Sequence, residues 1–228
     1  SICNNSALSN GGGVYIQSSV SDSIYGNFIS DNSSVHGGGM YVNASNTGAV
    51  IEDNVIWNNE VSGQGGGIHM RDSSIDLVRA LVYDNEADKG GGIFAYKGDS
   101  DFYNCIIHDN YATLTGTGAG VYLQTTGHDD MQFINCDLVY NENYGLYHIG
   151  DSSDDSNTKL TNCITYFNIG NQLGKSGDVI LTVSYTDIAG GYGGTGNFDE
   201  NPAFVGNTDF YLLPSSPCID AGNPDTLF

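Results

Sequence analysis

The sequence has few basic residues: Lys and Arg total 6 of 228, against 27 Asp and Glu, and the formal net charge is −21. A protein that binds nucleic acid needs a basic surface to contact phosphates, so this composition excludes nucleic acid as a partner. A strongly negative field also repels anionic polymers. Polyuronate lyases need cations to neutralise the sugar carboxylate during catalysis, and this chain supplies few of them.

Helical patterns are absent as well. Only 14% of the residues are charged, and no window of ten or more residues shows the 3.6-residue apolar period of an amphipathic helix. Short runs rich in Val, Ile, Tyr and Phe lie between Gly and Asn residues instead, a composition typical of β-strands. We expect an all-β protein, and we expect no membrane insertion by this segment.

An internal repeat of about 27 residues runs through the chain. One mark of it is an Asn that follows a short apolar run, as in NFISDN and CIIHDN. A second mark is a glycine cluster before an alternating run, as in GGGVYI and GGGMYV, and a third is an apolar residue eight positions before the next Asn. Three extended stretches per repeat, split by Gly, Asn, Asp and Ser, indicate the coils of a solenoid.

The repeat predicts a right-handed parallel β-helix. The strands cannot form hairpins because the same motif keeps returning in the same direction, and parallel crossovers are usually right-handed. We expect about eight coils with three faces each. Each coil is one rung of the solenoid, and the strands of neighbouring rungs should lie about 4.8 Å apart. The coils should occupy residues 1–188, and residues 189–228 should form an irregular C-terminal cap.

The repeated Asn has a structural interpretation. Asn tolerates left-handed backbone conformations, and its amide can bond the same amide one rung away. We therefore predict an asparagine ladder rather than a series of ligand sites. Its members are Asn5, Asn32, Asn59, Asn85, Asn110, Asn141 and Asn168.

The strand after each glycine cluster predicts a row of outward-facing rings. Its first and third residues should point inward and its middle residue outward. Such a row could stack on sugar rings or dock a partner, or its rings could stack on one another as cross-strand pairs do. The row consists of Tyr15, Tyr41, His69, Phe94, Tyr122 and Tyr147.

The string NCIIHDN, residues 104–110, resembles a nucleophilic site because it contains Cys105, His108 and Asp109. The repeat argues against that interpretation. The equivalent positions of successive coils are here called a slot. The slot of His108 holds Trp57 in one coil and residues such as Ser, Tyr and Val in others, so its residues share no chemical role. We predict no catalytic residue in this string.

Three cysteines occupy one slot on successive coils: Cys105, Cys136 and Cys163. They should stack at strand spacing, within reach of a disulfide. Three thiols cannot pair completely, and free Cys is among the most buried residue types. We predict a stack of buried thiols. A metal site of Cys ligands is disfavoured, because no CxxC pair occurs and the three slots are collinear rather than tetrahedral.

The chain also resembles a known family, the right-handed β-helix repeat proteins of bacterial surfaces, within the pectin-lyase-like superfold. The glycine-rich coils carry the general likeness. Residues 183–225, which end in SPCIDAGNPD, resemble the terminal segment that precedes a variable anchoring or sorting tail in large secreted or surface proteins. The matching positions are Tyr185, Asp187, Asn201, Pro202, Phe204, Asp209, Phe210, Leu212, Ser216, Pro217, Ile219, Asp220, Ala221 and Gly222.

The resemblance implies an extracellular or cell-surface protein whose full chain continues past Phe228 into an anchor. We also expect further coils, or a docked subunit, before Ser1, because SICNN resembles the middle of a coil and no signal peptide precedes it. Terminal rungs need to be covered. We expect residues of the C-terminal segment to cover the last rung, namely Pro202, Phe204, Leu212 and Leu213.

The function that we predict is a non-catalytic structural or adhesive module with no cofactor, which binds copies of itself end to end or surface glycans. The alternative is a carbohydrate-active enzyme, either a polysaccharide lyase or a glycoside hydrolase, or a glycan-binding module. The most suitable site for that chemistry is Arg71 and Lys97 beside acidic residues. Those acidic residues are Asp72, Asp99 and Asp101.

Calcium is a further possibility in two acidic loops. These are GHDD, residues 127–130, and GDSSDDSN, residues 150–157. Neither loop has the ligand spacing of a known calcium motif. The long repeat step between Asn110 and Asn141 indicates that two loops bulge from the solenoid there, and such loops are common binding sites.

Overall fold

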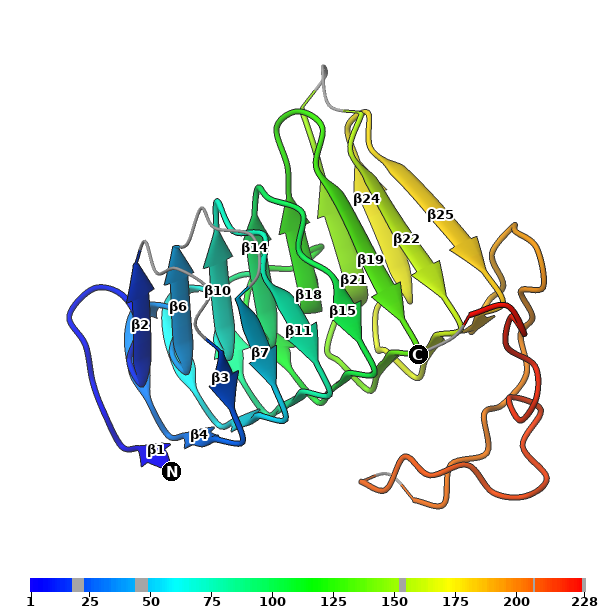
Figure 1. Ribbon diagram of the computed structural model, residues 1–228, viewed down its shortest axis with the longest axis horizontal. Helices are drawn as coiled ribbons and strands as arrows, with labels where there is room; N and C mark the ends of the chain where they lie inside the picture. The colour runs from blue at the N-terminus through cyan, green and yellow to red at the C-terminus, as the bar shows by residue number, and fades with distance from the viewer. Residues whose placement is uncertain (18–22, 44–48, 152–154, 207, 227–228) are drawn as a thin grey trace.

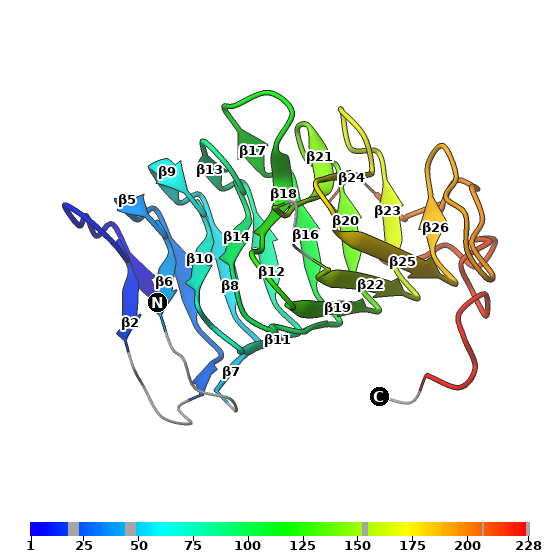
Figure 2. The same ribbon diagram turned by 90° about the horizontal axis from the view of Figure 1, so that it is seen from above.

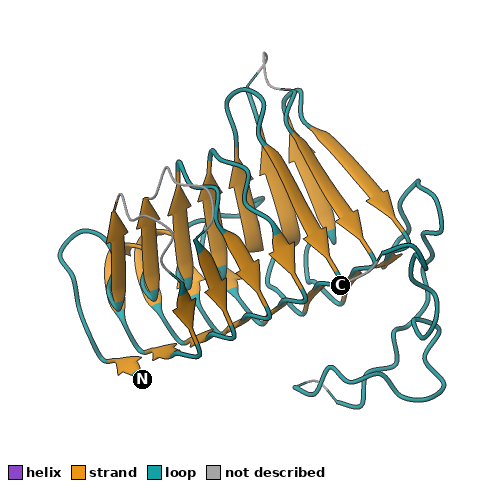
Figure 3. Ribbon diagram, viewed as in Figure 1, coloured by secondary structure: helices purple, strands orange, loops and turns teal. Residues whose placement is uncertain are grey.

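In the computed structural model the chain forms a parallel β-solenoid (Figure 1). The structure describes residues 1–17, 23–43, 49–151, 155–206 and 208–226. Within these ranges there are strands and loops but no helix (Figure 3), and hence no helix that could cross a membrane. Successive coils stack along the long axis, with the first coil at one end and residues 189–226 at the other.

Three of the four sheets run the length of the solenoid. Sheet 1 has eight strands: β1 (Ile2–Cys3), β4 (Phe28–Ser30), β8 (Val55–Trp57), β12 (Leu81–Tyr83), β16 (Ile106–His108), β20 (Asp137–Val139), β23 (Ile164–Tyr166) and β26 (Asp187–Ile188). Sheet 2 has seven: β2 (Val14–Gln17), β6 (Met40–Asn43), β10 (Ile68–Arg71), β14 (Ile93–Tyr96), β18 (Gly118–Gln124), β21 (Tyr144–Ile149) and β24 (Leu173–Ser176).

Sheet 3 is the third long sheet, and sheet 4 is short. Sheet 3 comprises β3 (Ile24–Tyr25), β7 (Val50–Glu52), β11 (Asp76–Val78), β15 (Phe102–Tyr103), β19 (Asp130–Ile134), β22 (Asn157–Thr161) and β25 (Ile180–Ser184). Sheet 4 comprises β5 (Ser33–His36), β9 (Glu60–Gln64), β13 (Glu86–Ala87) and β17 (Tyr111–Ala112). All the strand pairs are parallel and join consecutive coils, for example β12 to β16.

The prediction of a parallel β-helix is therefore confirmed, with one correction to its cross-section. We predicted three faces per coil, but four coils carry a fourth, short strand between sheets 1 and 2, seen at the side of the solenoid in Figure 2. These strands follow the ladder Asn, where the chain stays extended before the next glycine cluster. The eight strands of sheet 1 bound seven full turns.

The interior is a single apolar column. In the glycine-cluster strands the first and third residues point inward, as Ile68 and Met70 do in β10, and both are at most 1% exposed. Phe102 and Phe133 stack inside with ring centroids 4.2 Å apart. His148 takes an inward position too, where Thr125 and Thr158 form hydrogen bonds to its ring nitrogens at 2.9 and 3.0 Å.

The asparagine ladder is present as predicted. From Asn5 to Asn141 each Nδ2 group donates to the Oδ1 atom of the next Asn, for instance from Asn85 to Asn110 at 3.1 Å, and the Nδ2 group of Asn168 ends the ladder by donating to Gln172 Oε1. Each Oδ1 also accepts the backbone N–H of the preceding ladder Asn. The inner members are at most 1% exposed, so the ladder satisfies buried backbone groups at a corner where the strands end.

The ladder explains the glycine clusters. A Cβ atom added at Gly92 would lie 2.6 Å from the carbonyl oxygen of Gly120 and 3.0 Å from the amide of Asn110. A real Cβ does not approach other atoms so closely, so only glycine lets the backbone pass over the ladder amide at this corner. Gly37, at the start of another cluster, has φ of 64°, a conformation that also favours glycine.

A second ladder, which the sequence analysis missed, includes the cysteines. Asn27 donates to Asn54 Oδ1 at 3.1 Å in the slot before sheet 1, and three coils later thiols occupy that slot. The backbone N–H of Cys105 donates to Cys136 Sγ at 3.4 Å, and Cys105 Sγ donates to the carbonyl oxygen of Leu77 at 3.4 Å. These thiols therefore replace amide groups in a corner ladder.

The C-terminal segment first pairs with the last rung, where Ile188 N donates to Phe198 O at 2.9 Å, and then runs back beside sheet 1. Residues 203–206 and 208–213, here called the tail hairpin, lie side by side, with Val205 N donating to Tyr211 O at 2.9 Å. We predicted that Phe204 would cover the last rung. Instead it packs against Phe210, which lies 4.6 Å from the His108 ring, three strands before the end of sheet 1.

Interrupting the ladder should destabilise the whole solenoid. In an Asn141→Ala variant, Asn110 loses its acceptor and the carbonyl groups of Ile107 and Val139 lose a donor. Each buried polar group left without a partner costs about 1–3 kcal/mol, so we expect the free energy of unfolding to fall by about 3 kcal/mol or more. Urea denaturation followed by circular dichroism measures this change.

The control is Glu142→Ala, one residue further on, where the side chain is exposed. We expect this variant to change the free energy of unfolding by about 0.5 kcal/mol or less. Equal losses in the two variants would contradict a stabilising role for the ladder.

Candidate functional site

The predicted row of rings forms a continuous stack on the outer face of sheet 2. Consecutive centroids lie 4.8 to 5.8 Å apart along Tyr15, Tyr41, His69, Phe94, Tyr122 and Tyr147. The four inner rings are at most 4% exposed, whereas Tyr15 at the end is 48% exposed. Because each inner ring presents its faces to its neighbours, a ligand meets mainly ring edges along this row. Binding by the row remains a prediction.

A groove of about 240 Å3 runs beside the row. Its walls carry the amides of Asn10, Gln64 and Gln124, together with His36 and Arg71. These side chains supply hydrogen-bond donors and acceptors above a floor of ring edges, a combination found in small-ligand sites.

The histidines of the groove are held neutral. Burial, together with the nearby His36 and Arg71, lowers the pKa of His69 to about 4, although the hydrogen bond with the Gln64 carbonyl opposes the shift. Burial and the nearby Arg71 lower the pKa of His36 as well, and its Nδ1 accepts the backbone N–H of Gln64 at 3.2 Å. Arg71 is therefore the positive charge of this groove.

Basic residues gather at the same face. Arg71 and Lys97 lie over the Tyr96 ring, 5.7 and 5.1 Å from its centroid, and Lys89 lies 5.3 Å from the Tyr122 centroid. Cations at such distances are attracted to the ring face. Three of the six Lys and Arg residues of the chain therefore border this one face.

The predicted carbohydrate-active cluster around Arg71 and Lys97 is only partly assembled. Arg71 forms an exposed ion pair with Asp72 at 3.3 Å. The carboxyl groups of Asp99 and Asp101, by contrast, accept backbone N–H groups of β19, at 2.8 and 3.0 Å. These two acids stabilise the bulged coil.

The string NCIIHDN is divided between the inside and the outside of the solenoid. Cys105 is fully buried in the corner ladder, whereas His108 packs under Phe210 on the outer face and bonds Asp109 through Nδ1 at 2.6 Å. Burial raises the pKa of the stacked Cys136 thiol well above its usual value. Low-pKa thiolates are the reactive ones, so this stack has the environment of inert thiols.

The structure describes all of one acidic loop and part of the other. In GHDD, Asp129 accepts the backbone N–H of Gly98 at 3.0 Å and His128 pairs with Asp155. Residues 152–154 of GDSSDDSN lie outside the described residues. Over the described part of the chain, no group of three or more His, Cys, Asp and Glu residues is arranged to hold a metal ion.

A larger cavity of about 500 Å3, here called the tail cavity, lies between sheet 1 and the C-terminal segment. Asp137 and Asp187 line it together with Cys218. Both carboxyl groups belong to one outward slot, since Ile164 pairs with Asp137 on one side and with Asp187 on the other. Their Cα atoms are therefore two rungs apart, roughly 9–10 Å.

The two acids have different environments. Burial raises the pKa of Asp137 to about 7, and no opposing charge offsets it. Burial also raises the pKa of Asp187, but hydrogen bonds from Glu200 N and Cys218 Sγ, both at 3.1 Å, favour its ionised form. Burial and the Asp187 carboxylate raise the pKa of Cys218 to about 12.

The sequence analysis missed the tail cavity, although the repeat held a signal for it. The slot is apolar in the earlier coils, where Phe28, Val55 and Leu81 occupy it, and becomes acidic at Asp137 and Asp187. A break in an otherwise uniform slot marks a changed environment. The sequence did not show that the C-terminal segment would cover these two rungs.

Comparison with protein families identifies the solenoid. The family model for the right-handed beta helix region matches residues 1–165, which is most of the chain. The chain belongs to the right-handed β-helix family. This match agrees with the parallel coils and confirms the predicted fold. Comparisons of the β-helix with curated proteins and with solved structures found no match.

The family match stops before the C-terminal segment. The predicted likeness of residues 183–225 to the segment that precedes an anchoring or sorting tail therefore stays a prediction. In the structure those residues form the wall of the tail cavity and the tail hairpin beside sheet 1.

Asp137 should make the stability of the β-helix depend on pH. Its pKa is about 7 in the folded state and about 4 in an unfolded chain, so the folded state binds more protons between these values. The contribution of Asp137 to the free energy of unfolding therefore falls as the pH rises from about 4 to about 7. At about 1.4 kcal/mol per pKa unit, the loss is at most about 4 kcal/mol.

An Asp137→Asn variant should lack this loss, and so gain stability relative to the native protein at pH 8 but not at pH 5. Urea denaturation at both pH values measures it. Asp130→Asn, an exposed acid on the neighbouring strand β19, is the control and should behave as the native protein does. A gain of the same size at both pH values would show that Asp137 is not protonated in the folded state.

Proposed function

We propose that this β-helix is a non-catalytic structural or adhesive module of an extracellular bacterial surface or secreted protein. The observation that carries the proposal is the use made of the polar and aromatic side chains in each coil. Asn110 and its equivalents bond the next rung, and the rings of the aromatic row stack on the next rung. Polar and aromatic side chains that could otherwise bind a ligand are thus used to join one coil to the next.

A module built in this way suits a rigid spacer. Each coil is tied to the next by parallel sheets and by the asparagine ladder, and most coils are also joined by the ring stack or by the second corner ladder, which Ala80 interrupts. Bending or stretching the rod must therefore break several of these interactions together. The acidic surface, with a net charge of −21, favours solubility outside the cell. A rigid rod of this type presents its loops and grooves at a fixed distance from its point of attachment.

End-to-end assembly is part of the proposal. Strand β2 is the edge strand of sheet 2, and the ring of Tyr15 on it is the open end of the aromatic row. Edge strands present unpaired N–H and C=O groups that bond another strand. A second copy stacked on this edge would extend both the sheet and the row.

Electron microscopy of the purified protein at near-physiological Ca2+ tests the assembly. We expect filaments one solenoid wide that dissociate when Tyr15→Lys places a charge at the edge. Tyr211→Lys, an exposed ring on the tail hairpin, is the control and should leave the filaments intact. Single short rods at all concentrations would contradict end-to-end assembly and leave a monomeric stalk.

Glycan recognition is the second candidate function, and the groove beside the row supports it. Three amides, two neutral imidazoles and Arg71 surround a space of about 240 Å3, which is suited to hydrogen bonding with sugar hydroxyl groups. We expect Arg71→Ala to lower binding to a panel of immobilised neutral and acidic oligosaccharides about ten-fold or more. Arg79→Ala, which removes a similar exposed Arg paired with Glu52 and Asp53, should retain binding.

The same panel separates binding from catalysis. The tail cavity supports the hydrolase form of this alternative, because inverting glycosidases use two carboxyl groups about 6.5–9.5 Å apart, one with a raised pKa. Release of reducing ends that Asp137→Asn abolishes would overturn the non-catalytic proposal. The absence of both binding and product release would leave the structural role alone.

A further inference from the structure

The outer face of sheet 1 is mainly apolar over its first strands, where Ser30 is a buried exception, and the chain covers only the later part, where Asp137 and Asp187 interrupt the apolar residues. Two outward slots make up this face. The uncovered part, here called the apolar strip, consists of Phe28, Val55, Leu81 and Ile106 in one slot and Trp57 and Tyr83 in the other. Phe28 is 54% exposed, and the other five are partly exposed.

The covered part shows what kind of group fits this face. From strand β16 onward the tail hairpin lies over the same two slots, and there His108, Val139 and Ile164 are at most 8% exposed. Phe210 of the hairpin packs on His108 at 4.6 Å. A polypeptide hairpin with apolar side chains is thus the natural cover of this surface.

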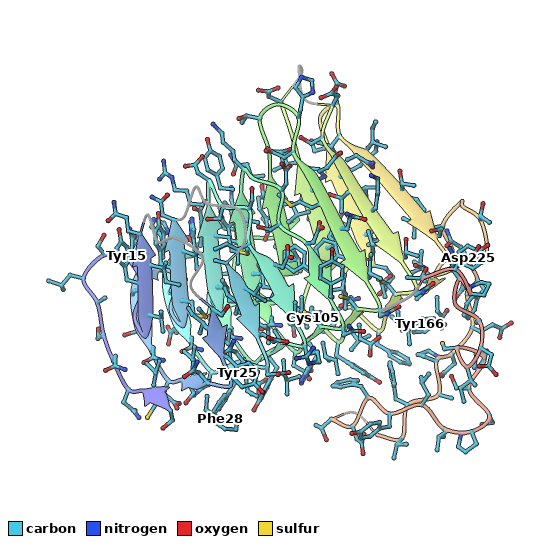
Figure 4. All side chains as sticks on the ribbon, in the orientation of Figure 1. Tyr15, Tyr25, Phe28, Cys105, Tyr166 and Asp225 are labelled. Atoms are coloured by element: carbon cyan, nitrogen blue, oxygen red, sulfur yellow. The ribbon has the colours of Figure 1, made fainter. Side chains whose placement is uncertain are left out.

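The strip continues directly from that covered part. A cleft of about 450 Å3 opens where the hairpin ends, lined by Leu81, Ile106 and His108 on the sheet and by residues 208–211 on the hairpin. In Figure 4, Tyr166 lies near the C-terminal segment, whereas Phe28 projects from the solenoid at the opposite end, away from that segment. A segment that entered the cleft could therefore extend along the strip without leaving the apolar surface.

The border of the strip is acidic. The turn residues after its second slot include Asp31 and Asp84. They line a separate cleft of about 250 Å3 with Glu60 and Glu86. An occupant of the strip therefore meets apolar side chains at its centre and carboxylates along one edge. Complementary chemistry is an apolar segment that also carries Lys or Arg.

Two other occupants fit less well. A second copy of this chain has only 6 Lys and Arg against 27 Asp and Glu, so its surface repels the acidic border. A sugar stacks on free ring faces, but the rings of Trp57 and Tyr83 are parallel within 6° and face each other, with centroids 6.1 Å apart. Aliphatic side chains such as Val55 and Leu81 also favour an apolar occupant.

We propose that the apolar strip is a docking site for an extended, basic and apolar segment of a different protein, which binds beside the tail hairpin and continues its cover of sheet 1. The segment would place alternate apolar side chains between the two outward slots. Its Lys or Arg residues would lie at the acidic edge. This proposal does not depend on the glycan groove or on end-to-end assembly, because it concerns a different face.

Fluorescence anisotropy with three labelled ten-residue peptides, each blocked at both ends, tests the site. One alternates Phe and Lys, one alternates Phe and Glu, and one alternates Ser and Lys. We expect the Phe–Lys peptide to bind at least ten-fold more tightly than either of the others. Equal binding by the Ser–Lys peptide would show attraction to the net negative charge alone and would overturn the proposal.

Variants of the protein locate the binding. Phe28→Lys and Val55→Lys should each weaken binding of the Phe–Lys peptide about ten-fold. Ile180→Lys changes the charge equally at an exposed isoleucine on sheet 3, so it should change binding less than two-fold. The melting temperature of each variant shows whether it is folded, and Phe28 is exposed enough for its replacement to leave the core intact.

Two results would overturn the assignment. The first is equal weakening by Ile180→Lys and by the strip variants, which would place the peptide elsewhere or make its binding purely electrostatic. The second is binding of neutral oligosaccharides that Phe28→Lys and Val55→Lys abolish while peptide binding persists. That pattern would make the strip a glycan site.

Discussion

The stacking of each coil on the next, in one register, is the constraint on which the rest of this structure depends. A coil of about 27 residues cannot bury its own apolar side chains, because it encloses only a thin slice of core. Once two coils are in register, the amide of Asn85 meets that of Asn110 and the ring of Phe94 meets that of Tyr122. Each such pair fixes the register for all the other slots, since a slip by one residue would turn inward side chains outward.

This constraint explains why residue types that are common in catalytic sites are poor guides to function in a solenoid. Cys105, His108 and Asp109 are neighbours in sequence, yet the first belongs to a buried corner ladder and the second to an outer face. The residues that merit attention are those that depart from the pattern of their slot. Asp137 and Asp187 depart from an apolar slot, and they line the largest cavity described here.

The faces of the rod differ in chemistry although one repeat generates them all. Sheet 2 carries a row of stacked aromatic rings bordered by cations such as Lys89. The first strands of sheet 1 carry an apolar surface bordered by acidic residues. The C-terminal segment adds to this difference by covering only the last strands of sheet 1. One repeat thus produces a rod whose long faces differ in charge and in hydrophobicity.

The sequence by itself determined the coil repeat, the parallel strands, the inward slots and the asparagine ladder, because stacked coils repeat every interaction and so leave a period in the sequence. It did not determine the fourth strand or the second corner ladder. Nor did it place Phe210 against His108, a contact between residues 102 positions apart with no period to reveal it. Only the tertiary structure could decide where a non-repeating segment lies, and that position raises the pKa of Asp137 and leaves the apolar strip uncovered.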